Sequence, residues 1–410
     1  MTQRLRVLKI LTLVAGLTLI SGGASCALLY LFLPFFYHGP DVLATNLTLA
    51  SLAALTLTLG FTLSYQARNS LKGRPSSTFR PPSPWFIVLV FFLCLIVGQA
   101  MLSLLASPVL TSLAFPPLHV LAAVSPALAI LAFVARRTRA ASWRTVSLEV
   151  SHGALLAPMG ALAAELVALL VVGLVIAFVF ALTPGGIEQL LELSINLQDP
   201  AWIEDPANLA QLVLSPWALT IIVLIFVVIA PLLEEFLKGL GVLLLGYRLR
   251  GEAQALLWGV ACGAGFALAE SLFNGSIALE GWGAVMIMRW GATLMHCVGT
   301  GIVGLGWHQA LAGRRPWRLL AAHGASWGVH ALWNGAALAV FVPSLLMVAQ
   351  PQDFVAQSVA SLVVLSSLAF LVLLTISMAI VLLYLTRRVG RPSSGTVLSD
   401  EHNPFPIKIP

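Results

Sequence analysis

Residues 217–246 read WALTIIVLIFVVIAPLLEEFLKGLGVLLLG, an apolar run interrupted by two adjacent carboxylates and one ammonium. About 20 apolar residues let a helix cross a bilayer, so this stretch predicts a membrane-spanning helix. A charged side chain at mid-membrane costs about 2.5–3.5 kcal/mol, so Glu234, Glu235 and Lys238 need partners. Glu234 precedes Lys238 by four residues, the favourable spacing for an ion pair within one helix. That pairing leaves Glu235 without a structural reason to be there.

The remainder of the 410-residue chain is equally apolar, since 59% of its residues are hydrophobic and 9% are charged. An ordinary soluble domain carries about 25% charged residues. The sequence therefore predicts an all-α, polytopic membrane protein with about ten transmembrane helices. We expect these helices at roughly residues 10–36, 42–66, 85–107, 118–135, 154–182, 217–246, 256–278, 284–306, 319–345 and 357–386.

The basic residues predict the orientation of these helices. Of the 22 Lys and Arg residues, 20 lie at the N-terminus, in alternate loops or at the C-terminal end. By the positive-inside rule, both termini are expected to be cytoplasmic. This topology explains the net charge of +6, so we expect a multi-pass protein of the plasma membrane, in contact with lipid and without a nucleic-acid partner.

Nearly all the ionisable residues within the expected helices fall in five consecutive spans. They are Glu165, Glu234, Glu235, Lys238, Glu270, Arg289, His296, His323 and His330. The chain is therefore expected to contain an accessory four-helix bundle (1–150), a core of helices five to nine (151–346), and a last transmembrane helix with a cytoplasmic tail (347–410). Packing roles are expected for Glu165 and His323.

The spacing of polar residues suggests that several of them meet. With a rise of 1.5 Å per residue, His296, His330 and Glu270 each lie about 17–21 Å from one end of their helices, near the middle of the membrane. Pro231 can kink its helix and open backbone groups near Glu235. We expect Glu235, Glu270, His296 and His330 to share one wet pocket.

Small residues indicate how closely two of these helices approach. Glycines recur in the helices at 256–278 and 284–306, where they allow tight helix packing. They are Gly259, Gly263, Gly265, Gly299, Gly301 and Gly304. Three further pairs four residues apart give one polar stripe per helix, namely Phe266 with Glu270, His296 with Thr300, and His330 with Asn334.

Two hydrolytic mechanisms fit these residues. Glu270, His296 and His330 form the His₂Glu set of a catalytic zinc site, and Glu234 or Glu235 can then act as the general base. Without metal, the same acids could act as a glutamate pair whose pKa values are separated by burial and mutual repulsion. The residues alone leave both mechanisms open.

The order of the motifs resembles the PrsW family of intramembrane proteases, a relative of the CAAX-protease and bacteriocin-processing superfamily. The resemblance covers about residues 217–336. It depends on EEFLK (Glu234, Glu235, Lys238), GFALAE (Phe266, Glu270), RWGATLMHCVGTG (Arg289, His296, Thr300) and HALWN (His330, Asn334). It departs from the family pattern at Ser271, where the family usually has Asn; the nearest Asn here is Asn274.

This resemblance implies a function for the core at 151–346. Glu234 and Glu235 would supply the catalytic acid or base, and Glu270, His296 and His330 would form the metal or proton-relay set. Asn334 would be a further ligand or an oxyanion donor, while Lys238, Phe266, Arg289 and Thr300 would support the site. The expected substrate is a membrane-tethered, single-span protein such as an anti-sigma factor, and the expected cofactor is zinc.

Two other protein classes are alternatives to this function. A CAAX-type or bacteriocin-processing peptidase usually shows EExxxR and FxxxH motifs, whereas Lys238 stands three residues after Glu235 here and Glu270 replaces the histidine. A proton- or ion-coupled transporter also buries acids and imidazoles. Transporters commonly have repeated halves, however, and the polar residues here are confined to one half of the chain.

Overall fold

The structure, a computed structural model, describes residues 3–37, 39, 41–105, 107–138, 141–246, 249–277, 279, 281–349 and 351–390. Within these residues the chain is helical and forms no β-sheet, apart from one isolated bridge between Thr78 and Ser142. The tail from residue 391 lies outside the described residues. The predicted all-α class is confirmed.

The helices follow one another as long spans with short connections. The N-terminal helices are α1 (Gln3–Phe36), α2 (Val42–Leu71), α3 (Pro84–Leu104) and α4 (Pro108–Thr138). One continuous span contains α5 (Trp143–Ser151), the π-helix η1 (His152–Leu156) and α6 (Ala157–Leu182). The connection that follows contains α7 (Gly186–Asn196), α8 (Pro200–Glu204) and α9 (Pro206–Leu214). A second interrupted span contains α10 (Pro216–Ile222), the π-helix η2 (Val223–Ile229) and α11 (Ala230–Leu244).

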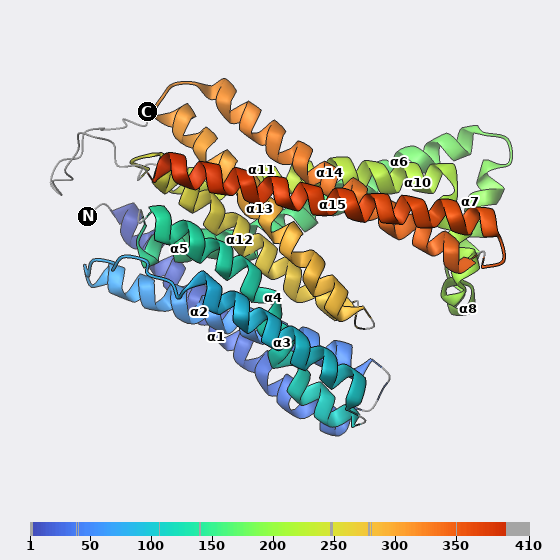
Figure 1. The fold of residues 1–410 in the computed structure, drawn as a ribbon, viewed down its shortest axis with the longest axis horizontal. Helices are drawn as coiled ribbons and strands as arrows, with labels where there is room; N and C mark the ends of the chain where they lie inside the picture. Colours follow the sequence, from blue (N-terminus) through green and yellow to red (C-terminus); the bar gives the residue numbers. More distant parts are fainter. Residues whose placement is uncertain are drawn as a thin grey trace.

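Four long helices complete the chain. They are α12 (Glu252–Ile277), α13 (Trp282–Leu311), α14 (Pro316–Ala349) and α15 (Phe354–Val389). Figure 1 shows α1–α4 on one side of the molecule and α6, α10, α14 and α15 on the other, with α12 and α13 between them. The middle position of α12 and α13 matters, because these two helices carry Glu270 and His296.

Nine helices among the described residues are long and apolar enough to cross a membrane. They match nine of the ten predicted spans, so the chain is a multi-pass membrane protein. The tenth predicted span, at 284–306, corresponds to the 30-residue helix α13, which is not among the nine. This helix carries Arg289 and His296 and is buried along most of its length, so it does not need an apolar surface.

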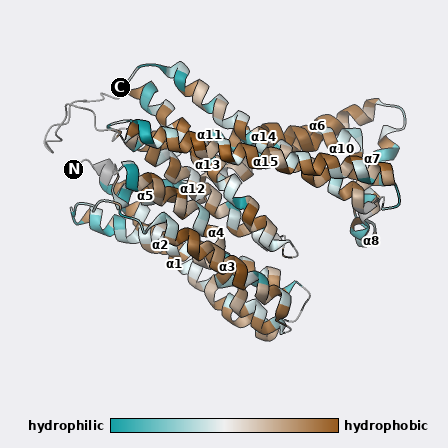
Figure 2. Cartoon of the chain, in the orientation of Figure 1, coloured by the Kyte–Doolittle hydropathy of each residue, from teal (hydrophilic) through white to brown (hydrophobic). Residues whose placement is uncertain are grey.

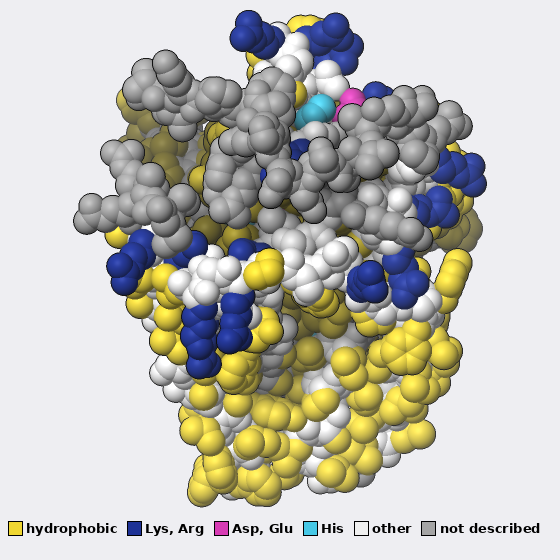
Figure 3. Space-filling view, turned by 90° about the vertical axis from the view of Figure 1, so that its left-hand side faces the viewer, with side chains coloured by type: hydrophobic (Ala, Val, Ile, Leu, Met, Phe, Trp, Pro, Cys, Tyr) yellow, Lys and Arg dark blue, Asp and Glu magenta, His cyan; other side chains and the backbone are white. Residues whose placement is uncertain are grey.

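Charge and hydropathy are distributed along the spans as expected for a membrane protein. Apolar residues cover the middle of the helices, and hydrophilic residues gather toward their ends (Figure 2). The end where α1 starts and α15 finishes carries many Lys and Arg side chains above an apolar belt (Figure 3). Assigning this end to the cytoplasm remains a prediction from the positive-inside rule.

The predicted close approach of two glycine-rich helices is confirmed. A Cβ atom on Gly259 would collide with the backbone of Thr300, one on Gly263 with the backbone of His296, and one on Gly304 with the backbone of Ala255. Only glycine lets the α12 and α13 backbones approach so closely. This packing brings the side chains of α12 within hydrogen-bonding distance of those of α13.

The π-helix η2 ends just before Pro231, which has no backbone N–H to donate. The wider π turn releases carbonyl groups from the regular helical pattern. The Asn334 side chain donates to the carbonyl oxygen of Phe226 at 2.9 Å, and the Trp327 indole donates to that of Val228 at 3.0 Å. Side chains of α14 thus occupy two carbonyl groups of the segment before Pro231, and the opening of this backbone to water stays a prediction.

The N-terminal helices pack directly against the core. One apolar cluster joins Val134 of α4, Leu256 of α12, Val298 of α13 and Leu382 of α15. The predicted boundaries at residues 150 and 346 fall within α5 and α14, respectively. The division into 1–150, 151–346 and 347–410 therefore stays a prediction about function.

Candidate active site

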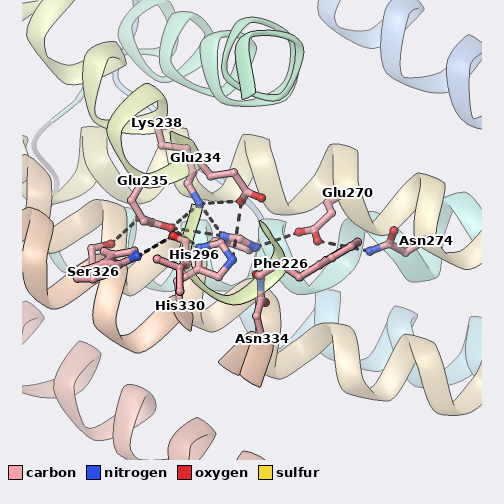
Figure 4. A network of polar contacts seen from close by, with 12 residues as sticks. Phe226, Glu234, Glu235, Lys238, Glu270, Asn274, His296, Ser326, His330 and Asn334 are labelled. Carbon is pink, nitrogen blue, oxygen red and sulfur yellow. Dashed lines mark hydrogen bonds and ion pairs between the residues drawn. The ribbon is translucent and has the colours of Figure 1, made fainter. Parts of the chain in front are cut away.

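Charged and imidazole side chains from α11, α12, α13 and α14 form one polar network inside the bundle (Figure 4). Glu234, Glu235 and Lys238 come from α11, and Glu270 comes from α12. His296 comes from α13, and Ser326 and His330 come from α14. The structure thus brings the expected acids and imidazoles together.

Lys238 lies at the centre of the network and is fully buried. Its Nζ atom is 2.5 Å from Glu235 Oε1, 2.8 Å from His296 Nδ1 and 3.6 Å from Glu234 Oε2. The Phe266 ring lies against the ammonium group, with 4.2 Å between Nζ and the ring centroid. The predicted pair with Glu234 exists, but the hydrogen bond goes to Glu235.

Both oxygens of Glu235 are occupied. Oε1 accepts hydrogen bonds from Lys238 and from His330 Nδ1 at 2.9 Å, and Oε2 accepts from Ser326 Oγ at 2.5 Å. The side chain is 1% exposed. Glu235 therefore holds its neighbours in place, and each of its oxygens already has a partner in the protein. Ser326 was not predicted, although it precedes His330 by one helical turn.

His296 is held between a cation and an acid. Because an ammonium group can only donate, His296 Nδ1 accepts from Lys238, and Nε2 donates to Glu270 Oε2 at 2.9 Å. The same Glu270 oxygen accepts from Arg289 Nη2 at 2.7 Å. Arg289 Nε donates to Ser271 Oγ at 3.0 Å, and Asn274 donates to Glu270 Oε1 at 3.4 Å. Ser271 and Asn274 thus both support this ion pair.

Glu234 differs from its neighbour because its Oε2 atom is buried and accepts no hydrogen bond among the described residues. Glu235 only accepts, so His330 Nδ1 carries the hydrogen and His330 Nε2 presents a lone pair. That lone pair lies 3.8 Å from Glu234 Oε2. Two electron-rich atoms so close together favour a cation, a proton or a water molecule between them.

Glu234, His296 and His330 are the described residues that could hold a metal ion, since one ligand atom of each lies within 4.8 Å of the other two. Their donor set, two imidazoles and one carboxylate, is that of a catalytic zinc site. Each imidazole also has the carboxylate partner that commonly orients a metal-binding histidine: Glu235 for His330, and Glu270 for His296.

This arrangement differs from the sequence-based expectation in the acid that joins the two imidazoles. The expected set contained Glu270, but Glu270 is hydrogen-bonded to His296 and ion-paired with Arg289, and its side chain is 35% exposed. Glu234 lies in the candidate ligand set in its place. The two acids differ because Arg289 already neutralises Glu270, whereas Glu234 is 3.6 Å from Lys238 without a hydrogen bond.

Three other predicted residues lie beside the network. Phe266 packs against His296, with 5.1 Å between ring centroids, as well as against Lys238. Asn334 donates its amide hydrogen to the Phe226 carbonyl, so it supports η2 and does not point that donor at a substrate. Thr300 is fully buried, and its hydroxyl has no hydrogen-bond partner among the described residues.

A second group of buried polar side chains lies about one turn further along α11, around Gly241. A Cβ atom on Gly241 would be 2.7 Å from Glu149 Oε2, 2.7 Å from His152 Cδ2 and 3.2 Å from Cys262 Sγ. Neither Glu149 oxygen has a hydrogen-bond partner among the described residues. Sequence reasoning missed Glu149, because residue 149 falls between two predicted spans.

A buried cluster of imidazoles and carboxylates within a helical membrane protein has the composition that an intramembrane hydrolase needs. The family model for PrsW family intramembrane metalloprotease matches residues 163–372, which is 210 of the 410 residues. The chain belongs to this family. The match contains all the predicted site residues, whereas neither the curated proteins nor the solved structures contain a match to the chain.

Family membership establishes the general activity. The protein is an intramembrane protease, and its substrate is a membrane protein within a lipid bilayer. Membership of a metalloprotease family also implies a metal ion, which agrees with the two imidazoles and the carboxylate found together. The transporter alternative has no comparable support.

Proposed function

We propose that the protein hydrolyses a peptide bond in or next to the transmembrane segment of a membrane-tethered protein in the plasma membrane. An anti-sigma factor is the leading substrate type. The observation that carries this proposal is the buried Glu234 Oε2 atom, which accepts no hydrogen bond from the part of the chain that the structure describes and faces His330 Nε2 at 3.8 Å. This oxygen is available to a water molecule, whereas both oxygens of Glu235 are taken.

The charges of the network suit a divalent cation. The carboxylates of Glu234, Glu235 and Glu270 contribute three negative charges, and Lys238 and Arg289 contribute two positive charges, which leaves one net negative charge. Glu234, His296 and His330 would hold the ion, with His296 Nδ1 giving up its hydrogen bond from Lys238 to bind it, and zinc is the metal proposed. Bound zinc would polarise a carbonyl oxygen and lower the pKa of water toward 7.

The side chains divide the remaining work. One oxygen of Glu234 would hold the ion, and the other accepts a proton as the water oxygen attacks the carbonyl carbon and returns that proton to the leaving nitrogen as the C–N bond breaks. Glu235 orients His330, and Glu270 orients His296. Lys238 holds Glu235 in place, whereas its hydrogen bond to His296 Nδ1 belongs to the metal-free arrangement, because that nitrogen has one lone pair.

A metal-free mechanism is the second candidate, because the Lys238 ammonium already contacts Glu235 and His296 and lies 3.6 Å from Glu234. In that version Glu234 acts as general base without help from an ion. Metal analysis of the purified protein separates the two versions. We expect bound zinc that is lost in a His330→Ala variant, together with inhibition by chelators.

Cleavage is tested by comparing membrane proteins that accumulate when Glu234→Gln replaces the wild-type enzyme. A general base contributes about 10²- to 10⁴-fold, so we expect cleavage to fall by about 10³-fold without loss of folding. Glu252→Gln is the matched control, because Glu252 belongs to an exposed pair with Arg388. Undiminished cleavage by Glu234→Gln would sink the proposal, and preferred cleavage of prenylated C-terminal peptides would favour the CAAX-type alternative.

A further inference from the structure

Glu165 is the one charged residue of α6, a helix whose apolar surface is largely exposed. It lies within residues 163–372, which match the family model, but it belongs to none of the four motifs that suggested the family. A charged side chain on a helix surrounded by lipid is costly, and such residues usually face the interior or a water-filled cavity. We therefore ask from its position on α6 whether Glu165 faces the lipid or the other helices of the protein.

The less exposed residues of α6 follow a helical period. Ala161, Ala164, Glu165, Ala168 and Val172 are buried or half-buried, and the leucines between them are exposed. This spacing places Glu165 on the stripe of α6 that packs against η1, η2 and α11. Glu165 thus points toward the protein, at the edge of its contact with α11.

Glu165 also lies at the depth of the catalytic acids. Gly160 packs against Leu237, since a Cβ atom at Gly160 would be 3.4 Å from Leu237 Cδ1. The chain returns to α11 through the far end of the molecule, so α6 and α11 run antiparallel (Figure 1). At 1.5 Å per residue, Glu165 lies about 7.5 Å from Gly160, and Glu234 lies about 4.5 Å from Leu237 in the same direction.

The charge of Glu165 confirms this neighbourhood. It interacts electrostatically with Lys238, Glu270 and His330, which belong to three different helices of the network. Glu165 forms no hydrogen bond or ion pair among the described residues. A carboxylate without a partner, placed level with the reacting groups, is suited to accept hydrogen bonds from a bound molecule.

The substrate of an intramembrane protease needs such an acceptor. A transmembrane helix satisfies its own backbone N–H groups, but a segment must leave the helical conformation before a peptide bond can be cut. The freed N–H groups then need acceptors, because lipid offers none. A carboxylate is the strongest acceptor among the ordinary side chains at neutral pH.

We propose that Glu165 is a substrate-binding residue whose carboxylate accepts hydrogen bonds from backbone N–H groups of the unwound substrate segment. This inference rests on the proposed function, because it assumes cleavage beside the catalytic acids. It assigns α6 the role of the helix along which the substrate is held, and it adds a residue to the site outside the four motifs.

The test combines changes in the enzyme with changes in the substrate. The full-length protein in proteoliposomes is given a quenched fluorescent peptide with an apolar helix of about 20 residues. In a matched peptide set, one central amide at a time is N-methylated, which removes its N–H group. The enzymes compared are the wild type, Glu165→Gln, Glu165→Ala and Gly173→Ala, the last being a control on α6 with open space around it.

We expect Glu165→Ala to lower kcat/KM for the unmodified peptide by about 10- to 100-fold, in line with a lost charge-assisted hydrogen bond. One N-methylated peptide should show a similar loss with the wild type and no further loss with Glu165→Ala, because both changes remove the same contact. Glu165→Gln should be intermediate, and Gly173→Ala should behave as the wild type. Zinc content and thermal unfolding should stay unchanged.

Additive losses at every methylated position, or an unchanged kcat/KM in Glu165→Ala, would overturn the proposal. Peptide binding is measured separately in the Glu234→Gln background, where cleavage is not required. If Glu234→Gln cleaves normally, the proposed function fails, but the binding comparison still reports on Glu165. Binding that is equal in Glu234→Gln with and without Glu165→Ala overturns the Glu165 role alone.

Discussion

The helix α11 has buried polar side chains around it at two levels, near Lys238 and near Gly241, and the two groups are built differently. Around Lys238, ammonium and guanidinium groups face the carboxylates, and both imidazoles are hydrogen-bonded. Around Gly241, Glu149 is 1% exposed and forms neither an ion pair nor a hydrogen bond among the described residues. The first group has the composition of a reaction centre, and the second does not.

The difference shows that burial of an acid does not by itself indicate catalysis. Near Gly241, His152 Nε2 lies 3.0 Å from the Leu237 carbonyl, and Cys262 Sγ donates to the Lys238 carbonyl at 3.1 Å. These contacts fix the backbone of α11 from outside the reaction centre. The two groups thus share one helix, with chemistry assigned to the group around Lys238 and support to the group around Gly241.

Among the substitutions that test this comparison, Lys238→Met should lower the stability of the protein most. It removes the central cation and leaves Glu235 buried without its charge partner. Breaking one partner of a buried ion pair costs about 3–5 kcal/mol. We expect unfolding in detergent to require correspondingly less denaturant. Arg289→Met is the matched control and should cost less, because its partner Glu270 is 35% exposed. Equal stability of Lys238→Met and the wild type would contradict the assignment.

Replacing Ser326 with Ala should have a smaller effect within the same group. It removes the hydrogen bond to Glu235 Oε2, and hydrogen bonds to charged groups contribute about 1.5–3 kcal/mol. We expect a loss of thermal stability and a fall in cleavage of about tenfold, because Glu235 holds His330 less firmly. Ser344→Ala is the control, since Ser344 bonds only to a backbone carbonyl of its own helix. Indistinguishable behaviour of the two variants would show that Ser326 does not position Glu235.

Replacing Glu149 with Gln should have the smallest effect, which makes it the sharpest check of the comparison. An amide of the same shape carries no charge to bury, and no ion pair is lost. We expect cleavage within about twofold of the wild type and stability equal to it or higher. Cleavage can be measured with the quenched peptide, and stability by thermal unfolding. A loss of cleavage as large as that of Glu234→Gln would mean that the group of side chains around Gly241 also takes part in catalysis.

Much of the fold and the meeting of the site residues could be predicted from the sequence. Apolar runs predict the spans, because the bilayer sets their length. The depth of Glu270, His296 and His330 predicts that they lie at one level, and the glycines of α12 and α13 predict the close packing that brings Glu270 and His296 together. Pro231 predicts the disturbed helix that became η2.

The roles of the individual acids could not be predicted in the same way. Glu234 and Glu235 are adjacent, so they differ by about 100° around the helix, and sequence alone does not say which of them Lys238 reaches. The structure distinguishes them through Ser326, His330 and Lys238, which together use every oxygen of Glu235. Glu149 was missed because its short helix α5 precedes the apolar part of its span.

The π-helix η2 has a consequence for how one span can serve two surroundings. A π turn contains an additional residue, which rotates everything beyond it by about 100° relative to a continuous α-helix. The segment before η2 and the segment after it therefore present different sides to their neighbours. A single crossing thus changes its orientation midway, without a loop exposed to lipid.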